Sequence, residues 1–225
     1  GIAEVEVAPG SASKSITQVF VNGAEGDLNN DGTDDVAFIL TWSGGGSGTF
    51  YYAVVALNIN GKYIGTDAVL LGDRIAPQTT EIRNGYVIVN YADRAEGEPM
   101  AEAPSVGVSK YLVVENGRLV ESPIFVDSPQ KSAMITSPLT VSGVAKGLWF
   151  FEASFPIALV DATGKEIAVS HVQAQGEWMT ENYVPFFGTI EFVKPASSEG
   201  KLILKKDNPS GLPEHDDSRE ILIKF

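Results

Sequence analysis

Residues 49–61, TFYYAVVALNING, join a run of aromatic, Val, Ala and Leu residues to an Asn-Gly pair. Aromatic and β-branched residues favour strands, and Asn-Gly readily adopts the two positive φ angles of a type I′ hairpin turn. Asn84-Gly85 and Asn116-Gly117 also stand between β-type runs such as GYVIVNY and KYLVVE. The pattern therefore predicts that the first half of the chain is a series of β-hairpins.

Strand-like runs continue through the second half, as KEIAVSHV, GTIEFV, KLILKK and EILIKF, and no segment has the pattern of an amphipathic helix. We expect an all-β, mainly antiparallel fold. Between residues 121 and 138 the sequence holds three Ser-Pro pairs and little continuous pattern, which is typical of a connector. The sequence predicts two domains, a β-hairpin-rich domain over 1–130 and a second domain over 131–225.

The composition restricts the classes of partner. The formal net charge is -13 and no run of Lys or Arg forms a basic patch, which argues against nucleic acid and anionic membrane surfaces. The absence of cysteine excludes disulfides and thiol chemistry. No apolar run is long enough to span a bilayer. The chain starts with Gly1 in place of Met, which fits a mature form or a trimmed piece, and a removed signal peptide or a lipid anchor upstream, as in an exported lipoprotein, is a hypothesis consistent with this start.

The stretch GDLNNDGTDDVAFIL, residues 26–40, crowds four aspartates in front of an apolar strand, and such like charges repel unless a cation neutralises them. Numbering from the first aspartate of the loop, oxygen donors fall at positions 1, 3, 5, 7 and 9, with a glycine at position 6, as in calcium loops. The predicted calcium ligands are Asp27, Asn29, Asp31, the Thr33 carbonyl and Asp35.

Position 12 of this loop is Phe38, so the bidentate glutamate of an EF-hand is missing and a strand follows in place of a helix. The pattern D-x-N-x-D-G-x-x-D over residues 27–35 resembles the calcium loops of FG-GAP-type repeats. We expect a structural calcium ion held with a dissociation constant of about 10⁻⁴–10⁻³ M, as in extracellular modules. The alternative is a turn without an ion, in which Asn and Asp side chains bond their own backbone.

Catalytic signatures are weak. The histidines are His171, in an alternating strand, and His215, in an acidic turn, so no HExxH zinc motif is present and any Ser-His-Asp triad must use one of them. A carboxylate pair for glycoside hydrolysis stays open because the chain holds 29 acidic residues. We expect no catalytic residues; the alternative is an enzyme acting on cell-wall or other polysaccharide.

Two further features have a structural and a functional interpretation. The glycine-rich loop 43–48 lacks the Gly-Lys-Ser/Thr ending of a phosphate-binding loop and is expected to be a hairpin connection, although Tyr51 and Tyr52 beside it could line a groove. The aromatic residues of the second half could form a sugar-binding platform, but core packing is the stronger expectation. These residues are Trp149, Phe150, Phe151, Trp178, Tyr183, Phe186 and Phe187.

From about residue 134 to the end, SPLTVSGVA, FEASFPIALVDATGKEI and NPSGLPEHDDSREILIKF resemble the immunoglobulin-like domain of bacterial sporulation and spore germination proteins. The resemblance implies a β-sandwich, an extracytoplasmic location and a role in cell-envelope assemblies, with no catalytic residues. The residues themselves predict about seven short strands there, the number of an immunoglobulin-like sandwich. The first half resembles uncharacterised exported bacterial proteins.

These observations combine into one hypothesis. We expect a non-catalytic, exported bacterial envelope protein, located in the periplasm or at the cell surface, that acts as a calcium-stabilised binding or assembly module. Its expected partners are envelope proteins or cell-wall glycan.

Overall fold

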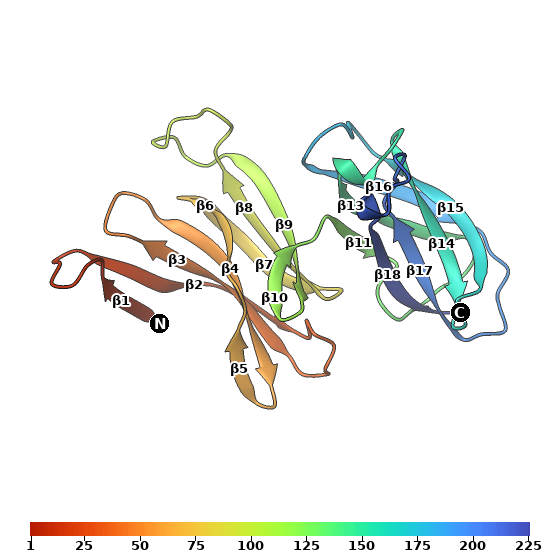
Figure 1. Ribbon diagram of the computed structural model, residues 1–225, viewed down its shortest axis with the longest axis horizontal. Coiled ribbons are helices and arrows are strands. Elements are labelled where there is room, and N and C mark those ends of the chain that lie inside the picture. The colour runs from red at the N-terminus through yellow and green to blue at the C-terminus, as the bar shows by residue number, and fades with distance from the viewer. The chain divides into compact units, whose positions relative to one another are not determined.

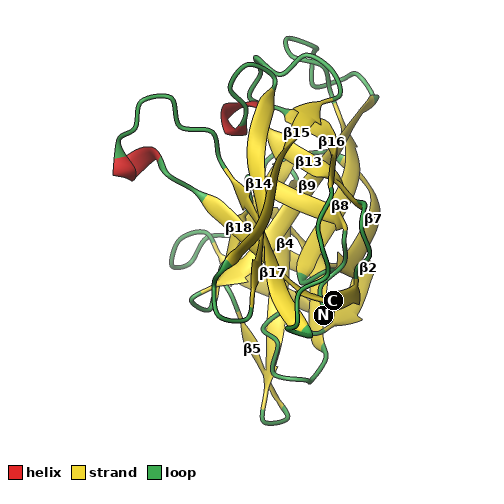
Figure 2. Cartoon of the chain, turned by 90° about the vertical axis from the view of Figure 1, so that its right-hand side faces the viewer, coloured by secondary structure: helices red, strands yellow, loops and turns green.

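The computed structural model describes the backbone of residues 1–225 and every side chain except that of Val21. Strands dominate the chain and pair almost entirely in antiparallel ladders (Figure 1), which confirms the all-β prediction. Helix is confined to two 3₁₀ turns, η1 (Gly147–Trp149) and η2 (Pro213–His215) (Figure 2). No helix in the described part of the chain is long and apolar enough to cross a membrane.

The chain divides into two compact units, Gly1–Ser122 and Pro123–Phe225. The division lies before residue 130, where the Ser-Pro pairs indicated a boundary. Strand β11 (Ile124–Ser128) pairs antiparallel with β13 (Leu139–Lys146) and places Ile124 in the core of the second unit. The segment that resembled a connector therefore contains the first strand of the second unit.

The first unit contains two sheets. Strands β1 (Ile2–Glu6), β2 (Lys14–Gly26), β3 (Asp35–Ser43), β4 (Phe50–Ile59), β5 (Lys62–Gly65) and β6 (Val69–Asp73) form the six-stranded sheet, in the order β1-β2-β3-β4-β5 with β6 also paired to β4. Strands β7 (Ala76–Arg83), β8 (Tyr86–Asp93), β9 (Val106–Glu115) and β10 (Arg118–Glu121) form the four-stranded sheet, in the order β10-β9-β8-β7.

The three Asn-Gly pairs make the hairpin turns that the sequence predicts. The pairs join β4 to β5, β7 to β8 and β9 to β10. Their φ angles are all positive, at 53° and 79° for Asn60 and Gly61, 55° and 76° for Asn84 and Gly85, and 52° and 76° for Asn116 and Gly117. Both central residues of a type I′ turn require positive φ, so these pairs set the register of the hairpins.

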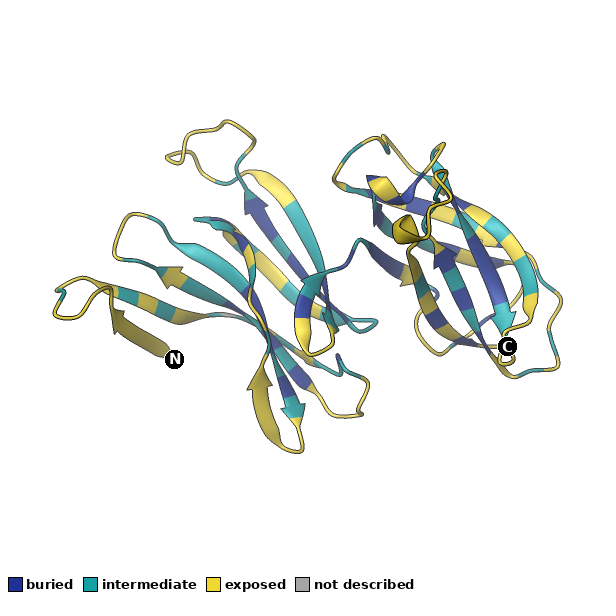
Figure 3. Ribbon diagram, viewed as in Figure 1, coloured by how far each residue is buried: buried dark blue, intermediate teal, exposed yellow. Residues whose placement is uncertain are grey.

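The core of the first unit lies between its two sheets. Alternate side chains of a strand point to opposite faces, and in β3 Ala37 and Ile39 are fully buried between more exposed neighbours. They pack with Val87 and Val89 of β8 and Leu112 of β9. Figure 3 shows this gradient, with β8 largely buried and β1 exposed along its whole length.

The second unit is an eight-stranded sheet folded around one core. After β11, its strands are β12 (Ala133–Met134), β13, β14 (Ser154–Asp161), β15 (Glu166–Ala174), β16 (Tyr183–Ile190), β17 (Glu199–Lys205) and β18 (Ser218–Lys224). The order is β11-β13-β16-β15-β14-β17-β18-β12, and only the short β12–β18 pair is parallel. The strand expected over 188–193 ends at Ile190, and Val193 beyond it is 87% exposed.

Aromatic side chains fill the centre of this core. Phe155 is fully buried and its ring lies 5.1–5.7 Å, centroid to centroid, from those of Trp149, Phe150 and Phe186. Core packing therefore explains three members of the aromatic set. Phe151 and Phe187 of the same set are 42% and 47% exposed and need another explanation.

Candidate functional site

The predicted calcium loop connects two antiparallel strands, since β2 ends at Gly26, β3 begins at Asp35, and these two residues pair. Asn30 and Gly32 within the loop have φ angles of 63° and 85°. These left-handed residues curl the backbone so that several N–H groups point inward. The loop is therefore strand-flanked, as its pattern indicated.

Three of the five predicted ligands, Asp27, Asn29 and Asp31, accept hydrogen bonds from N–H groups of this curled backbone. Asp27 Oδ1 accepts a hydrogen bond from the Asn30 N–H at 2.6 Å, and its Oδ2 accepts one from the Gly32 N–H at 3.1 Å. Asn29 Oδ1 accepts a hydrogen bond from the Asp31 N–H at 2.9 Å. These are the local side chain to backbone bonds expected of an Asx-rich turn.

Asp31 and Thr33 form the exposed end of the loop. Asp31 Oδ1 accepts hydrogen bonds from both the hydroxyl and the N–H of Thr33, at 2.6 and 2.9 Å. The hydroxyl of Thr33, its N–H and the amide of Asn29 hold the pKa of Asp31 below its ordinary value. The carboxylate is thus favoured in its charged form, the form that binds a cation.

Asp35 occupies a different environment from the other predicted ligands. Its side chain is fully buried, its Oδ2 accepts a hydrogen bond from the Leu28 N–H, and its Oδ1 accepts one from the Asn58 N–H, both at 2.9 Å. The carboxylate therefore ties the start of the loop to β3 and β4 without an ion. Among the side chains that the structure describes, no three from His, Cys, Asp and Glu form a group that could hold a metal ion.

The side-chain oxygens of Asp27, Asn29 and Asp31 all accept hydrogen bonds within the loop, so a calcium ion would have to compete with these bonds. Asp35 would have to exchange one of its two backbone hydrogen bonds for the ion. The sequence spacing does not reveal that two backbone N–H groups face the Asp35 carboxylate.

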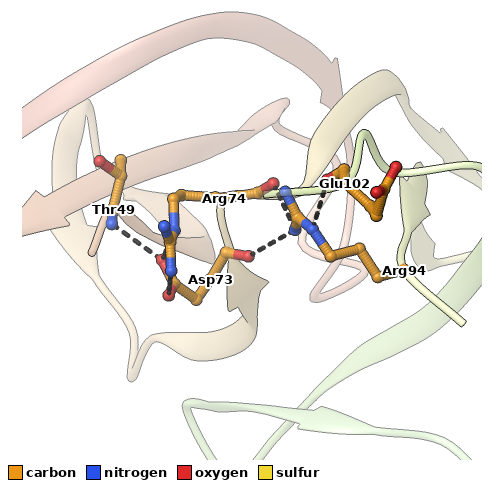
Figure 4. A network of polar contacts seen from close by, with 5 residues as sticks. All are labelled: Thr49, Asp73, Arg74, Arg94 and Glu102. Atoms are coloured by element: carbon orange, nitrogen blue, oxygen red, sulfur yellow. Dashed lines mark hydrogen bonds and ion pairs between the residues drawn. The ribbon is translucent and has the colours of Figure 1, made fainter. Parts of the chain in front are cut away.

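A second polar cluster ties two long loops to β6 (Figure 4). Asp73 accepts a hydrogen bond from the Thr49 N–H at 2.9 Å and pairs with Arg74 at 3.0 Å. Arg94 donates to the main-chain oxygen of Glu102 at 2.7 Å and to that of Arg74 at 3.1 Å. The cluster fixes the end of the glycine-rich loop and the acidic loop after β8, which is a structural role.

Asp73 stays ionised in this cluster. Partial burial of its carboxylate acts to raise the pKa. The hydrogen bonds from the Arg74 guanidinium and the Thr49 N–H, with the charges of Arg74 and Arg94, outweigh that effect and hold the pKa below the ordinary value.

The outer face of the six-stranded sheet is apolar. Leu40 and Trp42 of β3 alternate with the core residues and point away from the core, as does Tyr52 of β4, whereas Tyr51 packs with the core against Phe20. Thr17, Leu40, Trp42, Tyr52 and Ala68 line a groove of about 310 Å³. An uncharged groove with a Trp and a Tyr can stack against one face of a sugar ring or cover an apolar side chain.

The second unit has a pocket of about 660 Å³. Three segments line it, η1 with residues 150–151, the loop 178–181, and the loop 206–215 that includes η2. Leu148 and Met179 are each 74% exposed beside it, and Phe151 is 42% exposed. Contiguous apolar side chains that remain in water commonly mark a site of interaction.

Backbone contacts hold the three segments together. Gly147 has no room for a side chain, because a Cβ there would run into the carbonyl oxygens of Trp178 and Thr180. The Asp207 N–H donates to the Trp149 main-chain oxygen at 3.1 Å. The ring of Trp149 is anchored in the core, so the pocket is built on a rigid part of the fold.

Neither histidine forms a catalytic constellation in the described contacts. His171 lies exposed on β15. His215 Nδ1 lies 3.0 Å from Ser210 Oγ, and that hydroxyl donates to Asn208 Oδ1. Asn208 also donates to the Leu212 main-chain oxygen at 2.8 Å and to Asp216 at 2.7 Å. These bonds fold the loop 206–217 onto itself, so the Ser210–His215 pair stabilises one wall of the pocket.

Part of this pocket lies among residues that the sequence singled out, since Phe150, Phe151 and Trp178 of the aromatic set line it. Leu148 and Met179 stand beside tryptophans in GLWFF and EWMT, and nothing in those stretches separates an exposed side chain from a buried one.

Comparison with known proteins gives a family match within the second unit. Residues 123–211, less than half of the chain, match the model of the Gmad2 family, the immunoglobulin-like domain of bacterial spore germination. The match starts where the second compact unit starts. No curated protein and no solved structure matches the chain. The comparisons thus support the resemblance of the second half and give no support to the FG-GAP resemblance of residues 27–35.

Proposed function

We propose that the protein is a non-catalytic binding or assembly module of the bacterial cell envelope that works outside the cytoplasm. The observation that carries this proposal is the pocket of the second unit, with Leu148, Phe151 and Met179 exposed around it. Its volume lies within the range of about 300–1,000 Å³ of ligand-binding pockets. The immunoglobulin-like match adds support, because that family is a non-catalytic fold type associated with spore germination.

Burial of these side chains by a partner would remove apolar surface from water at about 25 cal/mol per Å². An immunoglobulin-like sandwich often presents its binding loops at one end, carried by a rigid pair of sheets. The proposed partner is another envelope protein. The polysaccharide-degrading alternative would use a carboxylate pair, and it predicts turnover of a glycan that a single carboxylate substitution abolishes.

Site-specific labelling and crosslinking test both the cellular location of the protein and the contact of a partner with the pocket. The chain has no cysteine, so Met179→Cys introduces a single thiol at the pocket and Val193→Cys introduces one at an equally accessible position that does not line it. On intact bacteria that produce the protein, a thiol reagent that cannot cross the cytoplasmic membrane is expected to label both variants. With a photoreactive maleimide, Met179→Cys is expected to give a protein adduct of defined mass that Val193→Cys does not give.

Two results would overturn the proposal. Thiols that react only after cell lysis would place the protein in the cytoplasm. If both variants gave the same protein adduct, or if neither gave one, the pocket would be ruled out as the site of contact.

We further propose that calcium stabilises the loop 27–35 of the first unit. A site with a dissociation constant of about 10⁻⁴–10⁻³ M adds about 1–2 kcal/mol at 5 mM calcium. The unfolding midpoint of the first unit is therefore expected to rise by about 3–8 °C in calcium relative to chelator, as measured by thermal circular dichroism.

The matched variants of this experiment are Asp31→Asn and Asp34→Asn. Both remove one exposed negative charge from the same loop, but only Asp31 is a predicted ligand. Asp31→Asn is expected to abolish most of the calcium-dependent rise and Asp34→Asn to retain it. Identical midpoints of the original chain in calcium and in chelator would leave the loop as a polar turn without an ion.

A further inference from the structure

We propose that the pocket of the second unit binds an extended segment of another envelope protein in which an apolar side chain is flanked by lysines or arginines. This inference rests on the proposed binding function and specifies the chemistry of the partner. It combines an apolar floor with an acidic rim at the same place on the fold.

The floor of the pocket suits an apolar side chain. Leu148 and Met179 project into solvent beside the half-buried Trp178 and the exposed Phe151, and Phe150 beneath them is buried in the core. The volume of about 660 Å³ exceeds the needs of a single side chain and leaves room for the flanking backbone. A methionine at a surface adapts to different apolar side chains, which suits recognition of a short segment.

The rim carries more negative than positive charge. Among the residues that line the pocket, Glu181 and Asp207 are acidic, Lys206 is basic, and His215 is the histidine. Carboxylates around an apolar centre favour a cationic partner, because complementary charge steers association and disfavours acidic competitors.

Particular contacts place these carboxylates at the rim. Glu181 and Asp207 line the pocket directly. Glu177 lies beside it, since its Oε1 accepts a hydrogen bond from the Met179 N–H at 3.0 Å. Asp216 is held by Asn208, which also lines the pocket. Lysines on the partner would thus meet negative charge on two walls of the pocket.

The test measures binding of fluorescein-labelled synthetic hexapeptides to the full chain by fluorescence anisotropy. The first peptide carries Leu-Phe between two pairs of lysines. The second replaces the lysines by glutamates, and the third replaces Leu-Phe by Ser-Gly. The first peptide is expected to bind at least tenfold more tightly than either of the others, and its affinity is expected to fall as salt is raised.

Matched variants locate the binding site. Met179→Ser is expected to weaken binding of the first peptide by about tenfold, whereas Val193→Ser, at another exposed apolar residue, is expected to leave it unchanged. Glu181→Gln is expected to weaken it several-fold, and Glu166→Gln, at an exposed glutamate on β15, is expected to have no effect. All four positions are largely exposed, and thermal unfolding of each variant confirms that it folds.

Several outcomes would overturn the inference. Equal binding of the lysine and glutamate peptides would rule out a preference for a cationic partner. Equal effects of Met179→Ser and Val193→Ser would rule out the pocket as the binding site. If no peptide bound while Met179→Cys still gave its adduct in cells, the peptide chemistry would be wrong and the binding function would stand. If the adduct were also absent, both proposals would fail.

Discussion

Replacement of Phe155 by alanine is expected to lower the free energy of unfolding of the second unit by about 3–5 kcal/mol. The Phe155 ring is fully buried and contacts three aromatic rings, with a centroid distance of 5.1 Å to Phe186 and 5.2 Å to Phe150. Its removal leaves a cavity beneath Trp149, whose ring lies 5.7 Å from that of Phe155. The surrounding strands are paired on both sides and can collapse only partly into that space.

Urea unfolding followed by tryptophan fluorescence provides the measurement. Trp42 is the only tryptophan in the first unit, so a Trp42→Phe background leaves Trp149 and Trp178 as reporters of the second unit. Phe187→Ala is the matched control, because Phe187 is 47% exposed and the same atoms are removed. The control is expected to cost less than about 1 kcal/mol. Equal losses in the two variants would mean that Phe155 is not a core residue.

The Phe155→Ala substitution is also expected to affect the pocket. Trp149 belongs to η1, and its main-chain oxygen accepts the hydrogen bond from Asp207 on the opposite wall. A loosened Trp149 is therefore expected to weaken peptide binding even though Phe155 does not line the pocket.

Asp35→Ala is expected to destabilise the first unit by about 2–4 kcal/mol, in chelator as well as in calcium. The substitution leaves the N–H groups of Leu28 and Asn58 without their acceptor, and Leu28 is itself buried. Buried donors that lose their partner cost about 1–3 kcal/mol each. Asp35→Asn retains one carbonyl oxygen and is expected to lose about half as much.

The control for Asp35 is its neighbour Asp34, which is exposed. Asp34→Ala removes the same charge and is expected to change stability by no more than about 0.5 kcal/mol. Denaturant unfolding in chelator separates the two roles of Asp35, because no ion contributes there. A loss at Asp35 that appeared only in calcium would show that the carboxylate acts as an ion ligand and that the two backbone bonds contribute little.

Local sequence was sufficient where local geometry decides the structure. The three Asn-Gly turns follow from the φ angles that those residues tolerate, and the strand runs follow from side-chain shape and alternation. The all-β class and the hairpins of the first unit needed no further information. The family resemblance located the immunoglobulin-like domain, which the match to residues 123–211 supports.

The aromatic residues show a property that the local sequence does not predict, namely which side chain is buried. Phe186 and Phe187 are adjacent and chemically identical, yet the first is buried and the second is 47% exposed. Alternation along a strand requires that one of them face outward, but the choice depends on which face of β16 the rest of the sandwich covers.

The fold class, the hairpin turns and an aspartate-rich loop between two strands could be predicted before the structure was known, because each depends on residues close together in the chain. Long-range packing is what brings Asp35 to the Asn58 N–H, pairs Ile124–Ser128 with the second unit, and assembles three separate segments into one pocket. These features depend on which distant segments pack together in each of the two cores. That packing is driven by burial of apolar surface, which is a property of the whole fold and not of a short stretch of sequence.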